Sequence, residues 1–394
     1  MFVINEASNT TWAYPIPSGH PYYHTLSLIN TQSTSYNNTL YIAGGYGYDE
    51  LRQGDVTWPI FTAIDIPNII TAIKNNASWD EVTSHIAQTF GPGLGVTGGE
   101  LVYDDKTNLF VLAVGQDFTG DYHGASDYSY YTSQYRLIYD VATTRNGNQL
   151  TVTFGNVAGF PADPSLSDST LSDTFGWEYE LHRRDLNVVK TMVSPTSPGF
   201  GLYGGVFDPI TNTNLFTRPV YWNYDTTIQP TLSGFHQLYN SYDCATLSLF
   251  DSSSNHSHIV FFGGVTAFIP TQYYVQQYSS MFQVPWTKNI SVLSNNVAST
   301  GFNSAYQIEY DAPTSNYFDS IASWGTEARF IPTLETTKRY FNNYDEIIDL
   351  TQIPSETTIL GTIYGGITVD PPIGSSKPCS RANHRFFTVS ITKC

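Results

Sequence analysis

Positive charge is scarce in this sequence. The chain of 394 residues has 17 Lys and Arg residues against 34 Asp and Glu residues, which gives a formal net charge of −17 at pH 7. It has no cluster of Lys and Arg that could displace counterions from a phosphate backbone, so nucleic acid is not an expected partner. The acidic residues are spread along the chain, which favours a role in solubility over a dedicated cation-binding surface.

Long hydrophobic runs and cysteines are also scarce. No run approaches the roughly 18 apolar residues of a membrane span, and the first residues lack the basic and apolar pattern of a signal peptide. Of the three cysteines, Cys244 lies in an apolar segment and is expected to be buried. A disulfide between Cys379 and Cys394 would close a C-terminal loop and indicate an oxidising compartment, and two free thiols are the open alternative.

Strand patterns dominate the chain. Short apolar segments rich in β-branched and aromatic residues recur between Gly, Pro, Asn, Asp and Ser clusters, as in LFVLAVG, YRLIYDV, HIVFFGGV and TILGTIYGGI. Helical periodicity is hard to find, and residues 66–82 are the best candidate for a helical turn inserted between strands. The sequence therefore predicts an all-β fold of antiparallel strands.

Several of these apolar segments end in a pair of glycines. The pairs are Gly44–Gly45, Gly204–Gly205, Gly263–Gly264 and Gly365–Gly366, with Gly115 as a variant. Two successive residues without a Cβ allow positive φ and let a neighbouring backbone approach closely. Such crowding is expected where radiating sheets meet around the axis of a ring.

An ordered set of segments carries a family resemblance over most of the chain. LYIAGGYGY, FTAIDIPNIITAI, VTGG, LHRRDLNVV, IVFFGG and IYGGI resemble segments of secreted kelch-type, galactose-oxidase-like β-propeller proteins of Bacteroidetes. The resemblance implies one β-propeller domain over residues 1–394, in an extracellular or cell-surface location, and transfers no activity. Residues 1–12 resemble the outer strands of a blade, which implies six blades with an incomplete first blade. Five blades closed by these N-terminal strands remain the alternative.

The segment ELHRRDLN holds the most specific charged cluster, with His182, Arg183, Arg184 and Asp185. Paired guanidinium groups suit carboxylate or phosphate ligands, but in a strand only half of the cluster can face a central channel. A structural network that ties adjacent blades together is the favoured alternative. Other polar residues on first strands could join a site around the axis, namely Glu100, Asp243, Glu327 and Arg329.

Three classes of function fit these features. We expect a binding or scaffold module for glycan or protein partners, because no nucleophile motif or phosphate loop stands out and a rigid ring with variable loops suits recognition. Arg and Glu converging at a channel mouth would instead suit proton transfer on a carboxylated sugar by a mutarotase-like or lyase-like enzyme. The third class is a subunit of a larger surface assembly, docked through an open strand edge.

The evidence for a cofactor in the sequence is weak. Asp117 and Asp121 lie in an Asp- and Gly-rich segment that could hold Ca²⁺, although the spacing does not follow the EF-hand pattern. A solvated loop is the favoured interpretation of this segment. No cofactor is expected, with calcium as the one candidate ion. A copper oxidase is not favoured, because Cys244 is the only internal cysteine and its surroundings do not resemble those of the oxidase.

Overall fold

The computed structural model describes most of the chain. The described residues are 1–5, 8, 10–104, 107–117, 131–132, 135–160, 181, 183–206, 215–223, 231–241, 243–266, 268–270, 275–277, 286–299, 304–311, 323–341, 346–369, 380–383 and 385–392. They form two compact units, residues 1–184 and residues 185–394. Each unit is described by itself below. The prediction of one domain over residues 1–394 stays a prediction.

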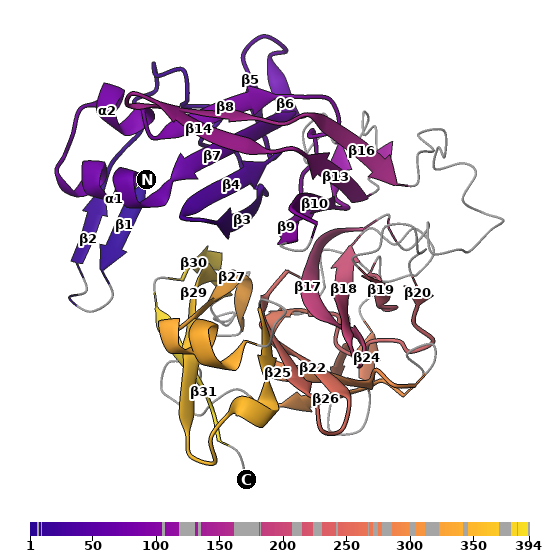
Figure 1. The fold of residues 1–394 in the computed structure, drawn as a ribbon. Coiled ribbons are helices and arrows are strands. Elements are labelled where there is room, and N and C mark those ends of the chain that lie inside the picture. The colour runs from indigo at the N-terminus through magenta and orange to yellow at the C-terminus, as the bar shows by residue number, and fades with distance from the viewer. Residues whose placement is uncertain are drawn as a thin grey trace, which may run out of the picture. The chain divides into compact units, whose positions relative to one another are not determined.

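Unit 1 contains two antiparallel sheets of four strands (Figure 1). The first sheet has the order β3-β4-β7-β8 and the second has the order β9-β10-β13-β16. Their bounds are Gln32–Tyr36 (β3), Thr39–Ala43 (β4), Ile60–Asp65 (β7), Ile86–Phe90 (β8), Glu100–Asp104 (β9), Leu109–Ala113 (β10), Tyr135–Tyr139 (β13) and Asn156–Phe160 (β16). In both sheets the spatial order of the strands is the same as their order along the chain, so both sheets are antiparallel meanders.

Unit 2 contains three further sheets of the same kind. The orders are β17-β18-β19-β20, then β26-β25-β22-β21, and then β27-β29 with β30 and β31 both paired to β29. Their bounds are Arg184–Ser194 (β17), Ser197–Val206 (β18), Val220–Asn223 (β19), Thr231–Leu232 (β20), Ala245–Asp251 (β21), His256–Val265 (β22), Trp286–Asn296 (β25), Tyr306–Tyr310 (β26), Ser323–Pro332 (β27), Thr358–Val369 (β29), Ser380–Ala382 (β30) and Phe386–Ile391 (β31). Strand β17 begins one residue before the boundary between the units.

Several shorter elements add to these sheets or connect their strands. Two-stranded hairpins are formed by Phe2–Asn5 (β1) with Thr10–Ala13 (β2), Tyr46–Asp49 (β5) with Gly54–Thr57 (β6), Gln116–Asp117 (β11) with Tyr131–Thr132 (β12), Ala142–Asn146 (β14) with Gln149–Thr153 (β15), and Phe268–Pro270 (β23) with Val275–Gln277 (β24). Strand β28 (Ile347–Asp349) adds to β21 in parallel. The described helices are Ile66–Lys74 (α1), Trp79–Thr83 (α2), the π-helix Thr336–Tyr340 and the 3₁₀-helix Leu350–Gln352.

Three of the four glycine pairs lie where successive sheets meet, and Gly366 of the fourth pair lies against Thr326 of its own sheet. All eight glycines of the four pairs have positive φ. A Cβ added to Gly44 would collide with the carbonyl oxygen of Val96, just before the next sheet, and one added to Gly263 would collide with that of Trp324. The backbone N–H of Gly45 donates to the same Val96 oxygen at 2.8 Å. The predicted reason for the glycine pairs, close approach of a neighbouring backbone, is confirmed.

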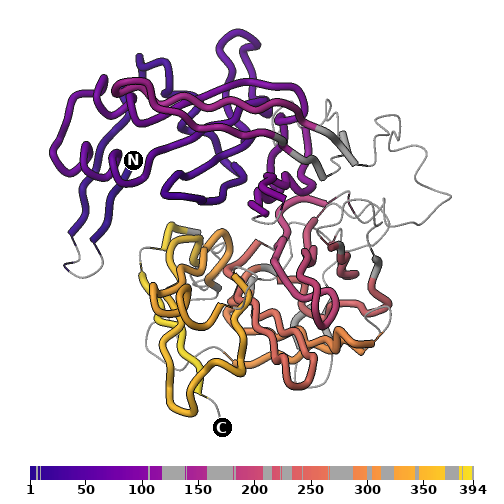
Figure 2. Tube along the Cα trace, in the orientation of Figure 1, coloured from indigo at the N-terminus to yellow at the C-terminus, as the bar shows by residue number. Residues whose placement is uncertain are grey.

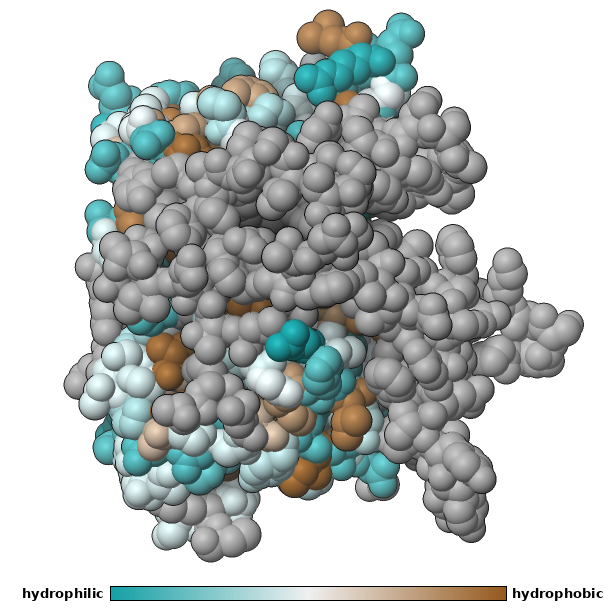
Figure 3. All heavy atoms as spheres, turned by 90° about the vertical axis from the view of Figure 1, so that its right-hand side faces the viewer, coloured by the Kyte–Doolittle hydropathy of each residue, from teal (hydrophilic) through white to brown (hydrophobic). Residues whose placement is uncertain are grey.

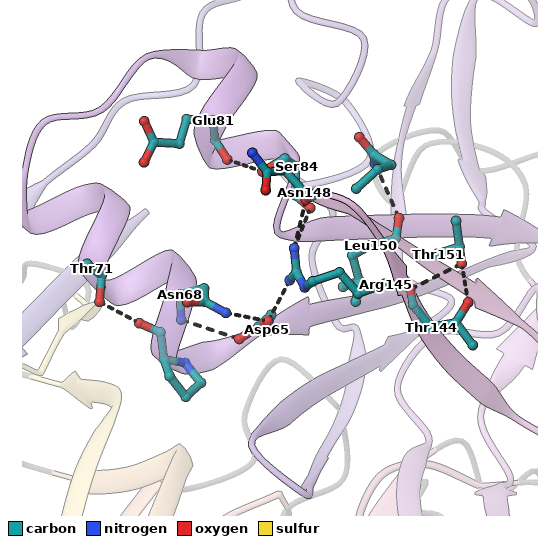
Figure 4. Close-up of polar contacts among 12 residues, drawn as sticks. Asp65, Asn68, Thr71, Glu81, Ser84, Thr144, Arg145, Asn148, Leu150 and Thr151 are labelled. Carbon is teal, nitrogen blue, oxygen red and sulfur yellow. Dashed lines mark hydrogen bonds and ion pairs between the residues drawn. The ribbon is translucent and has the colours of Figure 1, made fainter.

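The predicted helical insertion at residues 66–82 is confirmed and lies between β7 and β8. Asp65 caps the N-terminus of α1 by accepting from the Asn68 N–H at 3.3 Å, and it pairs with Arg145 of the β14–β15 hairpin at 2.5 Å (Figure 4). Arg145 also donates to the carbonyl oxygen of Asn148 at 2.7 Å. The hairpin therefore covers the outer part of the first sheet and holds the insertion in place.

The N-terminal hairpin packs against the same insertion. Figure 2 shows the start of the chain running beside the two helices. Ile69 and Ile73 of α1 form a hydrophobic cluster with Tyr14, and Val3 and Trp12 of the hairpin pack against it. Strands β1 and β2 pair with each other over four residues. The choice between six blades and five blades closed by these strands stays open.

Successive four-stranded antiparallel sheets that pack through glycine pairs are the construction of a β-propeller. The all-β, propeller-type prediction is confirmed. On the face shown in Figure 3, the hydrophobic residues among those described lie in several separate places between hydrophilic ones. Scattered exposed hydrophobic side chains of this kind are normal for a protein surface.

Candidate functional site at the start of the first strands

Each sheet has a residue with a left-handed backbone on its first strand or just before it. The φ angles are 48° at Asn30, 70° at Gly98, 50° at Asp185, 33° at Asp243 and 58° at Glu327. Asn, Gly and Asp adopt this conformation more readily than other residues, whereas a glutamate there is strained. Strain of this kind persists where the surroundings fix the backbone, and it often marks a functional site.

A repeated main-chain hydrogen bond fixes these residues. The N–H of Gly98 donates to the carbonyl oxygen of Asn30 at 3.2 Å, across the two sheets of unit 1. The N–H of Glu327 donates to the carbonyl oxygen of Asp243 at 2.6 Å, across two sheets of unit 2. Each bond joins the first strand of one sheet, or the residues just before it, to those of the next sheet, so side chains from different sheets come together there.

In unit 2 this arrangement assembles what we call the acidic rim, made of Asp185, Asp243, Glu327 and Arg329. The Arg329 guanidinium donates through Nη1 to Oδ1 of Asp243 at 3.2 Å. The Arg329 side chain is 49% exposed and that of Asp243 is 18% exposed. Asp185 is buried, and Glu327 is exposed. The rim therefore presents three carboxylates and one guanidinium, part of it open to solvent.

The charged groups of the rim shift the pKa of Glu327. Partial desolvation raises the pKa of Glu327 above its ordinary value, the negative charges of Asp243 and Asp185 raise it further, and Arg329 opposes them. The cause of the raised pKa is therefore partial desolvation of the carboxyl combined with crowding of like charges. A carboxyl in such surroundings binds a proton, a cation or a hydrogen-bond donor more readily than an isolated surface glutamate does.

The other predicted site residues lie elsewhere. Arg183 is fully buried and Arg184 is buried, and both belong to unit 1 together with half-buried Glu100 at the start of β9. The carbonyl oxygen of Arg183 accepts from the N–H of Gly115 at 3.2 Å, which ties the end of β10 to the segment before β17. His182 lies outside the described residues. The structure thus brings together four of the eight predicted residues, and ligand binding by all eight stays a prediction.

Residue types alone did not reveal why these four side chains converge. The left-handed backbone at Asp243 and Glu327 was missed, because neither residue type demands positive φ. The spacing in the sequence does not mark them either, since Asn30 lies 14 residues before Gly44, whereas Glu327 lies 38 residues before Gly365. Aligning the sheets on their glycine pairs therefore does not bring these residues into register.

Of the residues predicted to bind calcium or to form a disulfide, only Asp117 is among the described residues. Asp117 lies on β11 and its carboxylate accepts a hydrogen bond from the Thr57 hydroxyl, and Asp121 lies outside the described residues. Among the residues that the structure describes, no three His, Cys, Asp or Glu side chains are grouped to hold a metal ion. Cys244 is a buried free thiol, and burial raises its pKa. Cys379 and Cys394 lie outside the described residues, so calcium binding and the disulfide stay predictions.

Comparison with known proteins finds solved structures whose folds are weakly similar to that of this chain. No known protein-family profile matches the chain, and no curated protein matches it. The solved structure of YjhT is similar with a TM-score of 0.42 and 10% identity, over 94% of this chain and 86% of that chain. A fungal alcohol oxidase of the AA5 family, in complex with copper, is similar with a TM-score of 0.25 and 7% identity, over 87% of this chain and 69% of that one. At these scores neither likeness carries an argument about function.

The helices were also compared with the length and hydropathy of a membrane span. In the part of the chain that the structure describes, no helix is long and apolar enough to cross a membrane.

Proposed function

We propose that this chain is a secreted or cell-surface β-propeller module that binds a glycan at the acidic rim of unit 2. The observation that carries the proposal is the convergence of Asp243, just before β21, with Glu327 and Arg329 of β27, where Arg329 is about half exposed. Carboxylates accept hydrogen bonds from sugar hydroxyls, and a guanidinium donates to ring and hydroxyl oxygens. The rim combines both kinds of group at one place.

The strained backbone at Glu327 supports a role in binding. A non-glycine residue with positive φ costs of the order of 1–3 kcal/mol, and Asn or Gly would fit the position with less strain. The charge of Glu327 is also disfavoured by Asp243 and Asp185. A side chain that adds both backbone strain and charge repulsion is better explained by recognition than by stability.

A glycan array tests the proposal. Purified protein is applied to immobilised neutral, acidic and amino-sugar oligosaccharides, and the strongest ligand is titrated against the wild type and Glu327→Gln by calorimetry. We expect at least one specific ligand and a dissociation constant raised at least about tenfold in Glu327→Gln. Equal binding by the two proteins, or binding of protein partners with no glycan retained, would overturn the assignment.

An enzyme is the second candidate, and the raised pKa of Glu327 favours it. A carboxyl that keeps its proton to higher pH is suited to general acid catalysis, and Arg329 beside it could hold the carboxylate of an acidic sugar. The test is ¹H NMR of a reducing uronic or sialic acid with catalytic amounts of protein. Faster interconversion of the two anomers that is lost in Glu327→Gln supports an enzyme, and an unchanged rate excludes this activity.

A surface-assembly subunit is the third candidate. Strand β26 is the outer strand of its sheet, and its exposed side chains are Tyr306 at 47%, Ile308 at 44% and Tyr310 at 53%. A strand edge with three exposed apolar side chains can pair with another chain. Sedimentation of the wild type and an Ile308→Lys variant tests this candidate. A concentration-dependent complex that the substitution abolishes supports it, and a monomer throughout opposes self-assembly.

A further inference from the structure

A second group of ring and carboxylate side chains lies in unit 1 and shares no residue with the rim. The hairpin β5–β6 follows the glycine pair Gly44–Gly45, and its tip meets the segment that contains His24. The imidazole Nε2 of His24 lies 3.1 Å from Oε1 of Glu50. The His24 ring centroid lies 6.4 Å from that of Tyr48 and 5.2 Å from that of Tyr23, edge-on.

Tyr48 is much more exposed than the other tyrosine of its strand. Tyr46 and Tyr48 lie two positions apart on β5 and so share one face, but Tyr46, next to the glycine pair, is 6% exposed, whereas Tyr48, nearer the tip of the hairpin, is 48% exposed. The indole of Trp58 donates to the carbonyl oxygen of Gly47 between them at 3.3 Å. The half-exposed Tyr48 ring is therefore available as a contact surface beside two polar groups.

The polar groups beside Tyr48 are accessible and oriented. The Glu50 side chain is 74% exposed and that of His24 is 31% exposed. Their mutual contact restrains both side chains next to the tyrosine ring. Because the imidazole lies within ring-contact distance of both Tyr23 and Tyr48, the space between the two tyrosines is not an open cage for an ammonium ion. The exposed carboxylate and the net charge of −17 oppose a phosphate ligand.

We propose that Tyr48, His24 and Glu50 form a binding subsite for one neutral pyranose ring. A pyranose has an apolar face of C–H groups and an edge of hydroxyls. The apolar face stacks on the Tyr48 ring, as apolar groups do on aromatic faces, and the hydroxyls donate to Glu50 and contact the His24 imidazole. This subsite would extend the proposed glycan binding to unit 1, and its residues are separate from those of the rim, so each can be tested alone.

The test compares two exposed aromatic side chains of unit 1. Tyr48→Ala and the control Phe90→Ala, whose side chain is 57% exposed, are applied with the wild type to an array of neutral, acidic and amino-sugar oligosaccharides. We expect Tyr48→Ala to lower retention of neutral pyranosides at least about tenfold, with Phe90→Ala unchanged and Tyr48→Phe close to wild type, because the ring and not the hydroxyl makes the contact.

Other outcomes separate this subsite from the rim. Loss of binding in Glu327→Gln together with normal binding in Tyr48→Ala would overturn the subsite and leave the rim intact. The reverse pattern would support the subsite and overturn the rim. Equal losses in Tyr48→Ala and Phe90→Ala, retention of amino sugars alone, or no retention of any neutral sugar by the wild type would each overturn the proposal.

Discussion

The main-chain N–H of Glu327 donates to the carbonyl oxygen of Asp243 at 2.6 Å and holds Glu327 at φ 58°. The same bond recurs between Gly98 and Asn30 at 3.2 Å in unit 1. This bond therefore belongs to the backbone framework that joins neighbouring sheets. The side chain of the residue that donates it differs from sheet to sheet. The framework fixes the backbone, and the side chains at its five left-handed positions are free to vary for function.

Replacing Glu327 by Asn should stabilise the protein more than replacing it by Gln. Both variants remove the charge, but only Asn adopts positive φ readily, so Glu327→Asn is expected to exceed Glu327→Gln by about 0.5–1 kcal/mol in free energy of unfolding. Denaturant unfolding at pH 7 measures the difference. Equal stability of the two variants would show that the backbone at this position is not strained.

The stability gained by Glu327→Gln should depend on pH. The folded pKa of Glu327 lies above its ordinary value of 4.5, so its ionised form destabilises the fold at any pH above the folded pKa, and this cost disappears as the pH falls toward 4.5. We expect Glu327→Gln to be more stable than the wild type at pH 7 and equal to it near pH 4. Glu335→Gln, which alters an exposed ion pair with Arg339, serves as the control and should change little.

The contribution of Asp251 to the free energy of unfolding should depend on pH in the opposite sense. Hydrogen bonds from the hydroxyls of Ser253 and Ser254 hold the pKa of Asp251 at about 2, below its ordinary value of 3.8. Its contribution to stability is present above pH 3.8 and is lost as the pH falls toward about 2. Asp251→Asn is expected to be less stable than the wild type at pH 7, and this gap should narrow as the pH falls from about 4 to about 2 in the same unfolding series. A gap that is constant over this range would contradict the role of the charge.

A side chain at Gly44 should be far more disruptive than one at an isolated turn. Gly44 and Gly147 have nearly the same φ, 60° and 58°, but a Cβ would collide with Val96 at Gly44 and meets nothing within 4 Å at Gly147. Gly147→Ala is expected to cost about 1–2 kcal/mol from backbone strain alone, and Gly44→Ala more than about 3 kcal/mol. Similar costs at the two positions would show that the sheets are not in close contact there.

Thiol labelling tests the cysteine assignments together. Cys244 is 2% exposed with a raised pKa, so it should react with N-ethylmaleimide only after unfolding. If Cys379 and Cys394 form the predicted disulfide, native protein prepared without reductant takes up no label and unfolded protein takes up one. Two labels on the native protein would exclude the bridge.

The sequence predicted the repeating features of the fold and little of the individual chemistry. Strand patterns and glycine pairs recur in several copies, so backbone contacts such as Gly44 with Val96 follow from steric rules that act on every copy. The convergence of Asp243, Glu327 and Arg329 depends on pairing between sheets, which local patterns do not reveal. Arg183 resembled a ligand-binding residue by its type, yet its side chain is fully buried, which a local pattern of residue types does not reveal.

The most direct test of the account is a crystal structure of the protein with the oligosaccharide that the array identifies. The account predicts sugar density within hydrogen-bond distance of Glu327 and Arg329 in unit 2. Density confined to other surfaces, with the rim side chains contacting only one another, would contradict it.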